Sequence, residues 1–222
     1  MKKLSFILSY CALTLSATAA SAAGVYVGGN IGFAVPPSLE LTTAYGWEVA
    51  AADIEFDTGW ALNGAVGYDF DGFRVEGEIG YQHNKSGNTD FSLSGYDYRA
   101  TISTTDILNA KLKTVTYMAN GYYDFKNSSP WTPFLGAGIG AATVKLDDIS
   151  FAYDYGNYSY DDTVFAYQLM AGVSYAVSKN LALDLSYRFV GTESPEFDDG
   201  WGNAMDFEFY SHNFLLGARY TF

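Results

Sequence analysis

Apolar residues recur at every second position in eight segments of the chain, and this period of two is typical of β-strands with one apolar face. In segment 73–82 the apolar positions are Phe73, Val75, Ile79 and Tyr81. The other segments with this alternation are 25–34, 59–70, 113–125, 131–144, 164–177, 181–189 and the C-terminal stretch that ends at Phe222. The pattern therefore predicts an all-β protein with eight principal strands.

The connections between these predicted strands alternate between short and long. The short ones are 71–72, 126–130 and 178–180, and the long ones are 35–58, 83–112, 145–163 and 190–209. An even number of strands with tight turns at one end and long loops at the other is the layout of an outer-membrane barrel. We therefore predict a closed eight-stranded antiparallel transmembrane β-barrel from a Gram-negative outer membrane.

A soluble barrel or a β-sandwich is the alternative, and it would bury its apolar face and expose its polar one. Here the polar face holds several charged residues, while the apolar face continues around all eight segments. The lumen of an eight-stranded barrel is just wide enough to be filled by side chains. A charge directed into lipid at mid-depth costs about 2–4 kcal/mol. We therefore expect the polar face to point inward and the apolar face to contact outer-membrane lipid.

The N-terminus predicts export. Lys2 and Lys3 precede a largely apolar stretch, and Ala20, Ser21 and Ala22 supply the small residues of a cleavage site. We expect residues 1–22 to be a cleavable signal peptide and 23–222 to be the barrel domain. Cleavage would remove Cys11 and leave no thiol chemistry. The mean hydropathy of −0.01 agrees with a barrel, since alternating strands average to a neutral value.

The strand segments resemble the small outer-membrane β-barrel proteins, which include opacity-type surface antigens and the transmembrane domain of outer-membrane protein A, and which are often labelled a porin family. The resemblance rests on GVYVGGNIGF (24–33), FRVEGEIGYQ (73–82), TYMANGYYDF (116–125), WTPFLGAGIG (131–140), AGVSYAVSKNLALDLSYRF (171–189) and GARYTF (217–222). It covers nearly every predicted strand and none of the long loops. It implies a barrel without the periplasmic peptidoglycan-binding domain that some relatives carry.

The resemblance also implies an assembly signal at the C-terminus. A terminal aromatic residue with apolar residues at every second position before it is similar to the signal that the barrel assembly machinery recognises in this family. The matching residues here are Phe214, Leu216, Ala218, Tyr220 and Phe222.

Seven charged residues fall on the inward face and form a predicted interior charge network. They are Arg74, Glu76, Glu78, Asp124, Asp184, Arg188 and Arg219. Counting along the strands places Arg74 level with Asp124, and Asp184 level with Arg219. One interpretation is a salt-bridged plug, because buried charges are tolerated when they are paired. The other interpretation is a charge-lined path for ions or small solutes.

No catalytic or cofactor motif stands out. His83 and His212 fall on the apolar face near strand ends, and Ser211 points away from His212, unlike the His and Ser of lipid A deacylases. The spaced glycines Gly136, Gly138 and Gly140 lie in a strand with no helix after it. We therefore expect them to make room for large interior side chains or for close approach of strands rather than to bind phosphate. We expect no enzymatic activity, no cofactor and no metal site.

Acidic residues are concentrated in the long loops. The formal net charge is −13, and the excess of Asp and Glu lies in 35–58, 145–163 and 190–209. We predict a surface protein with a structural envelope role that binds an extracellular or host ligand through these loops, as an adhesin or surface antigen, and that binds no nucleic acid. The loops would be extracellular and both termini periplasmic. A small-solute or ion porin is the first alternative, and a lipid-modifying enzyme is the second.

Overall fold

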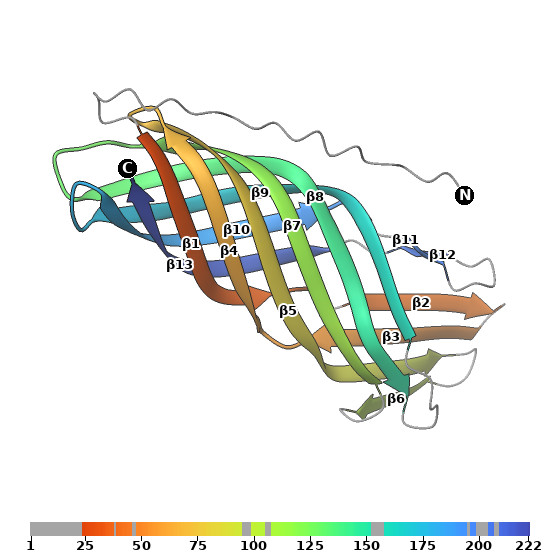
Figure 1. The fold of residues 1–222 in the computed structure, drawn as a ribbon. Coiled ribbons are helices and arrows are strands. Elements are labelled where there is room, and N and C mark those ends of the chain that lie inside the picture. The colour runs from red at the N-terminus through yellow and green to blue at the C-terminus, as the bar shows by residue number, and fades with distance from the viewer. Residues whose placement is uncertain are drawn as a thin grey trace.

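The computed structural model describes residues 24–37, 39–45, 48–94, 99–104, 108–151, 158–194, 196–198, 204–206 and 209–222. Eight strands form one closed antiparallel ring (Figure 1). They are β1 (Gly24–Val35), β4 (Gly59–Asp69), β5 (Phe73–Ser94), β7 (Leu108–Asp124), β8 (Trp131–Phe151), β9 (Tyr158–Ala176), β10 (Leu181–Thr192) and β13 (Tyr210–Thr221). Each pairs with its neighbour in sequence, and the pairing of β1 with β13 closes the ring. The predicted fold class is confirmed.

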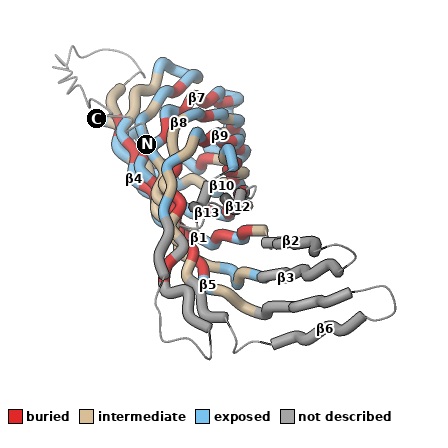
Figure 2. The backbone as a smooth tube through the Cα atoms, turned by 90° about the vertical axis from the view of Figure 1, so that its right-hand side faces the viewer, coloured by how far each residue is buried: buried red, intermediate tan, exposed pale blue. Residues whose placement is uncertain are grey.

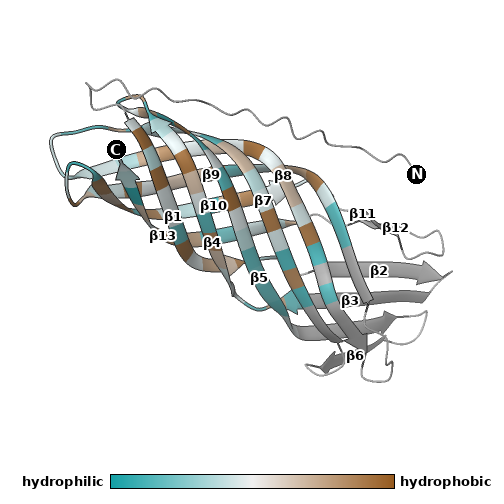
Figure 3. Cartoon of the chain, in the orientation of Figure 1, coloured by the Kyte–Doolittle hydropathy of each residue, from teal (hydrophilic) through white to brown (hydrophobic). Residues whose placement is uncertain are grey.

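The two faces of each strand differ in exposure, as the alternation predicts. Figure 2 shows buried and exposed residues following one another along the strands. Ile31 and Ile139 on the outer face are 60% and 62% exposed, whereas Glu78 on the inner face is 3% exposed. Figure 3 shows the same alternation in hydropathy. The molecule is therefore apolar outside and polar inside, which suits a barrel surrounded by lipid.

One end of the barrel, which we call the turn end, is closed by tight turns. Asp71 and Gly72 connect β4 to β5 with φ values of 66° and 120°. Positive φ at both central residues is what a two-residue type I′ hairpin requires. The side chain of Asp69 accepts a hydrogen bond from the backbone N–H of Asp71 at 2.8 Å, and Lys126 forms an ion pair with Asp71. The short connections predicted from the sequence are thus confirmed.

At the opposite end, which we call the loop end, the long connections contain further strands. Segment 35–58 contains a hairpin of β2 (Leu39–Tyr45) and β3 (Glu48–Phe56). Segment 83–112 contains the continuation of β5 to Ser94 and the strand β6 (Arg99–Thr104). Both β3 and β6 pair with this part of β5, so a sheet projects beyond the ring (Figure 1).

The remaining elements are short. β11 (Glu196–Asp198) and β12 (Ala204–Asp206) form a separate two-stranded sheet within the last long connection. Among the residues that the structure describes, no helix has the length and hydropathy needed to cross a membrane. The predicted signal peptide, 1–22, lies outside the described residues.

Candidate functional site

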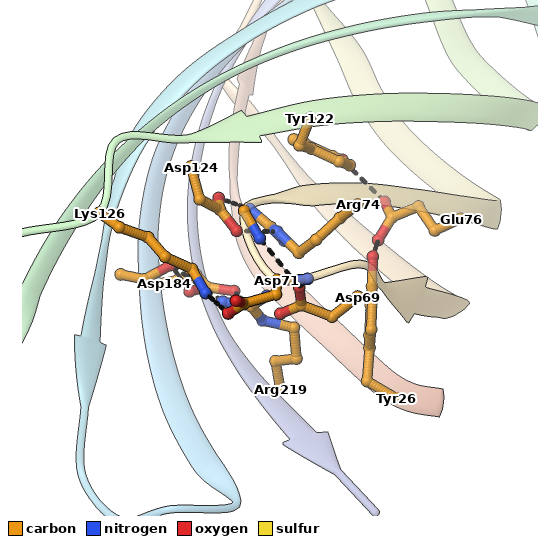
Figure 4. Close-up of polar contacts among 12 residues, drawn as sticks. Tyr26, Asp69, Asp71, Arg74, Glu76, Tyr122, Asp124, Lys126, Asp184 and Arg219 are labelled. Atoms are coloured by element: carbon orange, nitrogen blue, oxygen red, sulfur yellow. Dashed lines mark hydrogen bonds and ion pairs between the residues drawn. The ribbon is translucent and has the colours of Figure 1, made fainter. Parts of the chain in front are cut away.

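The lumen near the turn end is occupied by a bidentate ion pair. Arg74 on β5 donates to Asp124 on β7 through Nε to Oδ2 and Nη2 to Oδ1, both at 2.8 Å (Figure 4). Both side chains are buried. The guanidinium carbon of Arg74 also lies 4.5 Å from the ring centroid of Tyr122 and 5.1 Å from that of Phe134. Two parallel charge-assisted hydrogen bonds fix the guanidinium in orientation as well as in position.

Glu76 accepts hydrogen bonds from three side chains that reach it from other strands. The hydroxyl of Tyr26 on β1 donates at 2.8 Å, and that of Tyr122 on β7 donates at 2.7 Å. The amide nitrogen of Asn120 donates at 3.0 Å. Figure 4 shows Tyr26 and Tyr122 approaching Glu76 from different sides of the lumen. The carboxylate is stabilised by neutral donors, since burial of an unsatisfied carboxylate would be costly.

Asp184 and Arg219 face each other on the adjacent strands β10 and β13. The Nε of Arg219 lies 3.5 Å from Oδ2 of Asp184. Ser174 on β9 connects the two groups, because its hydroxyl hydrogen-bonds to Asp184 and accepts from Nη2 of Arg219 at 3.2 Å. This pair is held through a shared hydroxyl rather than by a bidentate contact.

The middle of the lumen is crossed by a second bidentate pair. Arg188 on β10 donates to Oε1 and Oε2 of Glu78 on β5 at 2.5 and 2.8 Å. The Glu78 side chain is 0% exposed and that of Arg188 is 6% exposed. With its amide oriented to satisfy both neighbours, Asn63 accepts from Nη1 of Arg188 at 3.0 Å. β5 and β10 are not neighbours in the ring, so this pair spans the interior.

The loop end of the lumen holds neutral polar groups and an apolar cluster. The Ser211 hydroxyl lies within hydrogen-bond distance of two acceptors, Gln82 Oε1 at 3.0 Å and Asn213 Oδ1 at 2.8 Å, and Gln82 donates to Asn84 at 2.9 Å. Beside them lies a buried cluster that consists of Leu112, Met118, Ala142, Val144, Ala166 and Phe209.

Two small cavities lie among the described side chains of the lumen. One cavity of about 30 Å³ lies toward the turn end and borders Glu76, Asp184 and Arg219. A second, of about 20 Å³, lies toward the loop end and borders Gln82 and Phe209. Arg188 lines both cavities. A cavity needs about 10–15 Å³ to hold one water, so each has room for one or two waters.

The structure thus places all seven residues of the predicted charge network on the inner face and brings six of them into three ion pairs. Glu76 is the exception, because it is bound by tyrosine and asparagine rather than by arginine. Sequence reasoning missed Tyr26 and Tyr122. The alternation could have identified them, because each is an aromatic residue at an inward position of its strand.

The candidate catalytic residues are not brought together. The hydroxyl of Ser211 points into the lumen, whereas His212 lies on the outer side and its Nδ1 is 2.7 Å from the hydroxyl of Tyr187. Gly136 and Gly138 face the side chains of Tyr122 and Asn120, so their lack of a Cβ makes room for interior groups. Within the described parts of the chain, no three metal-ligating side chains gather in one place.

The residues of the expected assembly signal lie on the outer face, four of them in β13 and Phe222 directly after it. Phe214, Leu216, Tyr220 and Phe222 are exposed, and the backbone N–H of Phe222 donates to the carbonyl of Val25 at 2.9 Å. Most of the acidic side chains predicted to form a binding surface, within 35–58, 145–163 and 190–209, lie outside the residues whose side chains are described.

The comparison with protein families gives one match that spans almost the whole chain. Residues 5–222 match the family described as "Outer membrane protein beta-barrel domain".

Two relatives and one solved structure are similar over most of the chain. The outer membrane protein PagN of Salmonella typhimurium is 30% identical over 224 residues, which cover 93% of this chain and 93% of PagN. Major surface antigen 4 of Anaplasma marginale is 30% identical over 186 residues, which cover 73% of this chain and 61% of the antigen. The crystal structure of Neisserial surface protein A covers 90% of this chain and 99% of its own, with a TM-score of 0.55 and 21% identity, and so shows the shared fold.

Proposed function

Since the chain belongs to the outer membrane protein β-barrel family, we propose that it is a surface protein that binds an extracellular partner through its loop-end segments. The observation that carries this proposal is the contrast between the two parts of the molecule. The lumen is filled by paired charges and packed side chains, whereas at the loop end a sheet of β2, β3, β5 and β6 projects beyond the ring. A rigid scaffold that holds variable segments is where binding usually resides.

The names of two relatives support the same role. One is a major surface antigen and another is an opacity protein of Neisseria gonorrhoeae, which is 24% identical over 186 residues. The proposed role for this chain is that of an adhesin or surface antigen. The loop end would face the medium, and the turn end, with both chain ends, would face the periplasm. In this proposal residues 1–22 direct export, and the outward residues of β13 are recognised by the barrel assembly machinery.

The charge of the loop segments indicates the chemistry of the partner. Acidic residues predominate in 35–58, 145–163 and 190–209, and the protein as a whole carries a net charge of −13. A partner with a basic surface fits this distribution. Its binding should weaken as salt is added, because exposed charges are screened beyond about 8–10 Å at physiological ionic strength.

The test is adhesion of a laboratory Gram-negative strain that produces the protein to cultured epithelial cells. Three variants replace 39–56, 148–158 or 195–208 with tight turns, and the control Ile79→Leu changes only the lipid-facing surface. Each barrel is first shown to be folded by a heat-dependent shift on a gel. We expect at least one shortened variant to lose most of the adhesion and the control to retain it. Full adhesion by all three shortened, folded variants would refute the loop-end proposal.

The filled lumen counts against the channel alternative. Arg188 stands between two cavities of about 30 and 20 Å³, and it is bound to Glu78 on the other side of the barrel. We therefore expect no steady conductance when the purified protein is inserted into a planar bilayer. A stable ion current would favour the channel.

A further inference from the structure

Four lysines gather on the outer face of the barrel at the loop end. Lys85 lies on β5, Lys111 and Lys113 lie on β7, and Lys145 lies on β8. The strand register places Lys85 opposite Lys111, and Lys113 opposite both His83 and Lys145. We call these four residues the lysine rim patch. All four have the outward orientation of Ile79 and Tyr117, so they stand on the lipid-facing side of the wall.

Asp147 fixes two of these lysines in place. Its Oδ2 lies 2.8 Å from Nζ of Lys113, and its Oδ1 lies 3.2 Å from Nζ of Lys145. The lysine side chains remain 34% and 45% exposed, whereas that of Asp147 is 12% exposed. One buried carboxylate thus holds two accessible ammonium groups side by side. Asp161, opposite Lys145, and Asp57, beside Gly87, flank the patch on its two sides.

The patch begins where the apolar surface ends. Along β5 the outward residues run Ile79, Tyr81, His83 and Lys85, and along β7 Tyr117 and Val115 precede Lys113. Outward residues are spaced two apart, which is about 7 Å along a strand. On β5 and β7 the nearest lysine is therefore two outward positions, about 14 Å along the strand, beyond the last outward tyrosine. A lysine near this interface costs far less than one at mid-depth in the membrane.

On the opposite side of the barrel, the described outward side chains near this level include one apolar residue and three rings that contact one another. They are Val35 on β1, Phe189 on β10, and Tyr210 and His212 on β13. Among the side chains that the structure describes, these lysines lie together in one sector, β5–β7–β8, of a protein with a net charge of −13.

We propose that the lysine rim patch binds the phosphate group of an anionic membrane lipid whose acyl chains lie along the outer faces of β5, β7 and β8. Three features fit this ligand. Ammonium groups bind phosphate oxygens as point charges. The exposed side chains of Ile79, Tyr117 and Ile139 supply an apolar surface for the chains, four to six residues along the same strands toward the turn end. Trp60, whose ring centroid is 6.1 Å from that of His83, borders the patch with an amphipathic ring suited to the interface. Lys85, Lys111 and Lys113 lie outside the acidic segments proposed to bind an extracellular partner, and Lys145 is the first residue of segment 145–163.

The test is lipid binding by the full protein, purified from membranes in a nonionic detergent and observed by native mass spectrometry. The probes are phosphatidic acid, phosphatidylcholine with the same acyl chains, and inorganic phosphate as a competitor. The variant Lys113→Gln with Lys145→Gln removes two charges from the patch. The matched control is Lys126→Gln with Lys179→Gln, which removes two lysines from the turn end. A third variant, Lys113→Arg with Lys145→Arg, keeps the charge.

We expect the wild-type protein to retain phosphatidic acid in preference to phosphatidylcholine. The Gln pair should weaken that binding about tenfold or more, because each lysine near an anionic lipid surface contributes to the attraction. The Arg pair and the turn-end control should bind as the wild type does. If the Gln pair fails to fold, Lys85→Gln with Lys111→Gln tests the same surface further out. Equal loss in patch and control variants, no loss in the Gln pair, or full displacement by inorganic phosphate at millimolar concentration would overturn the proposal.

Discussion

Glu78 and Arg188 face each other across the lumen with both side chains almost completely buried. Loss of one partner leaves a buried charge without compensation, at a cost of about 3–5 kcal/mol, whereas loss of both partners relieves it. We expect Glu78→Ala to lower the free energy of unfolding more than the double change Glu78→Ala with Arg188→Ala does. Urea unfolding of the barrel in lipid vesicles measures the difference. Additive losses in the double-mutant cycle would show that the two residues are not energetically coupled.

Gly136 and Gly77 differ in what a methyl group would meet. At Gly136, on β8, an added Cβ would overlap the ring of Tyr122, whereas at Gly77, on β5, no heavy atom lies within 4 Å. Overfilling a packed interior costs about 1–3 kcal/mol. Gly136→Ala should therefore destabilise the barrel by roughly that amount, and Gly77→Ala should be close to neutral or stabilising, as measured by the same urea unfolding. Equal effects of the two changes would contradict the packing of Tyr122 against β8.

At the scale of the element, β13 combines a structural and a proposed recognition role. Phe222 is 73% exposed, so its ring contributes little to the packed interior. If it acts as an assembly signal, Phe222→Ser should lower the amount of protein in the outer membrane severalfold, whereas Phe222→Tyr should have little effect. Quantitative immunoblotting of membrane fractions checks this.

The control for this change is Phe125→Ser. Phe125 is another exposed aromatic residue at the turn end, but it lies outside the terminal strand. Similar losses for Phe125→Ser and Phe222→Ser would show that the interfacial aromatic rings matter in general and that the terminal position does not.

The eight ring strands could be predicted from sequence because lipid on one side and a packed lumen on the other impose a strict period of two. The extensions of β5, β8 and β9, and the hairpin of β2 and β3, lie beyond this two-sided constraint. Their alternation is weaker, as with Leu39 and Leu41 in β2, and does not by itself distinguish a strand from a loop. The period-two alternation predicts which strands form the ring but underestimates how far they extend at the loop end.

The ion pairs and hydrogen bonds of the candidate site also fall into two groups, those that the sequence predicts and those that it does not. The pairs Arg74–Asp124 and Asp184–Arg219 join adjacent strands, so counting residues from the turns was enough to place their members at one level. Glu78–Arg188 and Glu76–Tyr26 join strands that are not adjacent. Such contacts depend on the diameter and stagger of the closed ring, which a linear count does not contain.

At the scale of the whole molecule, ring closure dictates how the protein responds to detergent. A closed sheet has no free edge at which unfolding can begin, and all of its strand backbone groups in the membrane are paired. We expect the purified protein to remain folded in SDS at room temperature and to unfold on boiling, with two gel positions as the readout. A single position, with solubility in buffer without detergent, would contradict a membrane-embedded barrel.

The seam between β1 and β13 joins the first ring strand to the last, with Tyr26 opposite Thr221 and Val35 opposite His212. Contacts between residues so distant in sequence are slow to form, because a long chain must be ordered before they repay its entropy. During synthesis, the free edge of β1 has no partner until residues 210–221 have been made. That edge is a template for pairing with other chains, so the unfolded protein is prone to aggregation before closure. Opening must reverse the same step, and we expect the lifetime of the barrel to be set by the rate at which this seam separates rather than by its equilibrium stability.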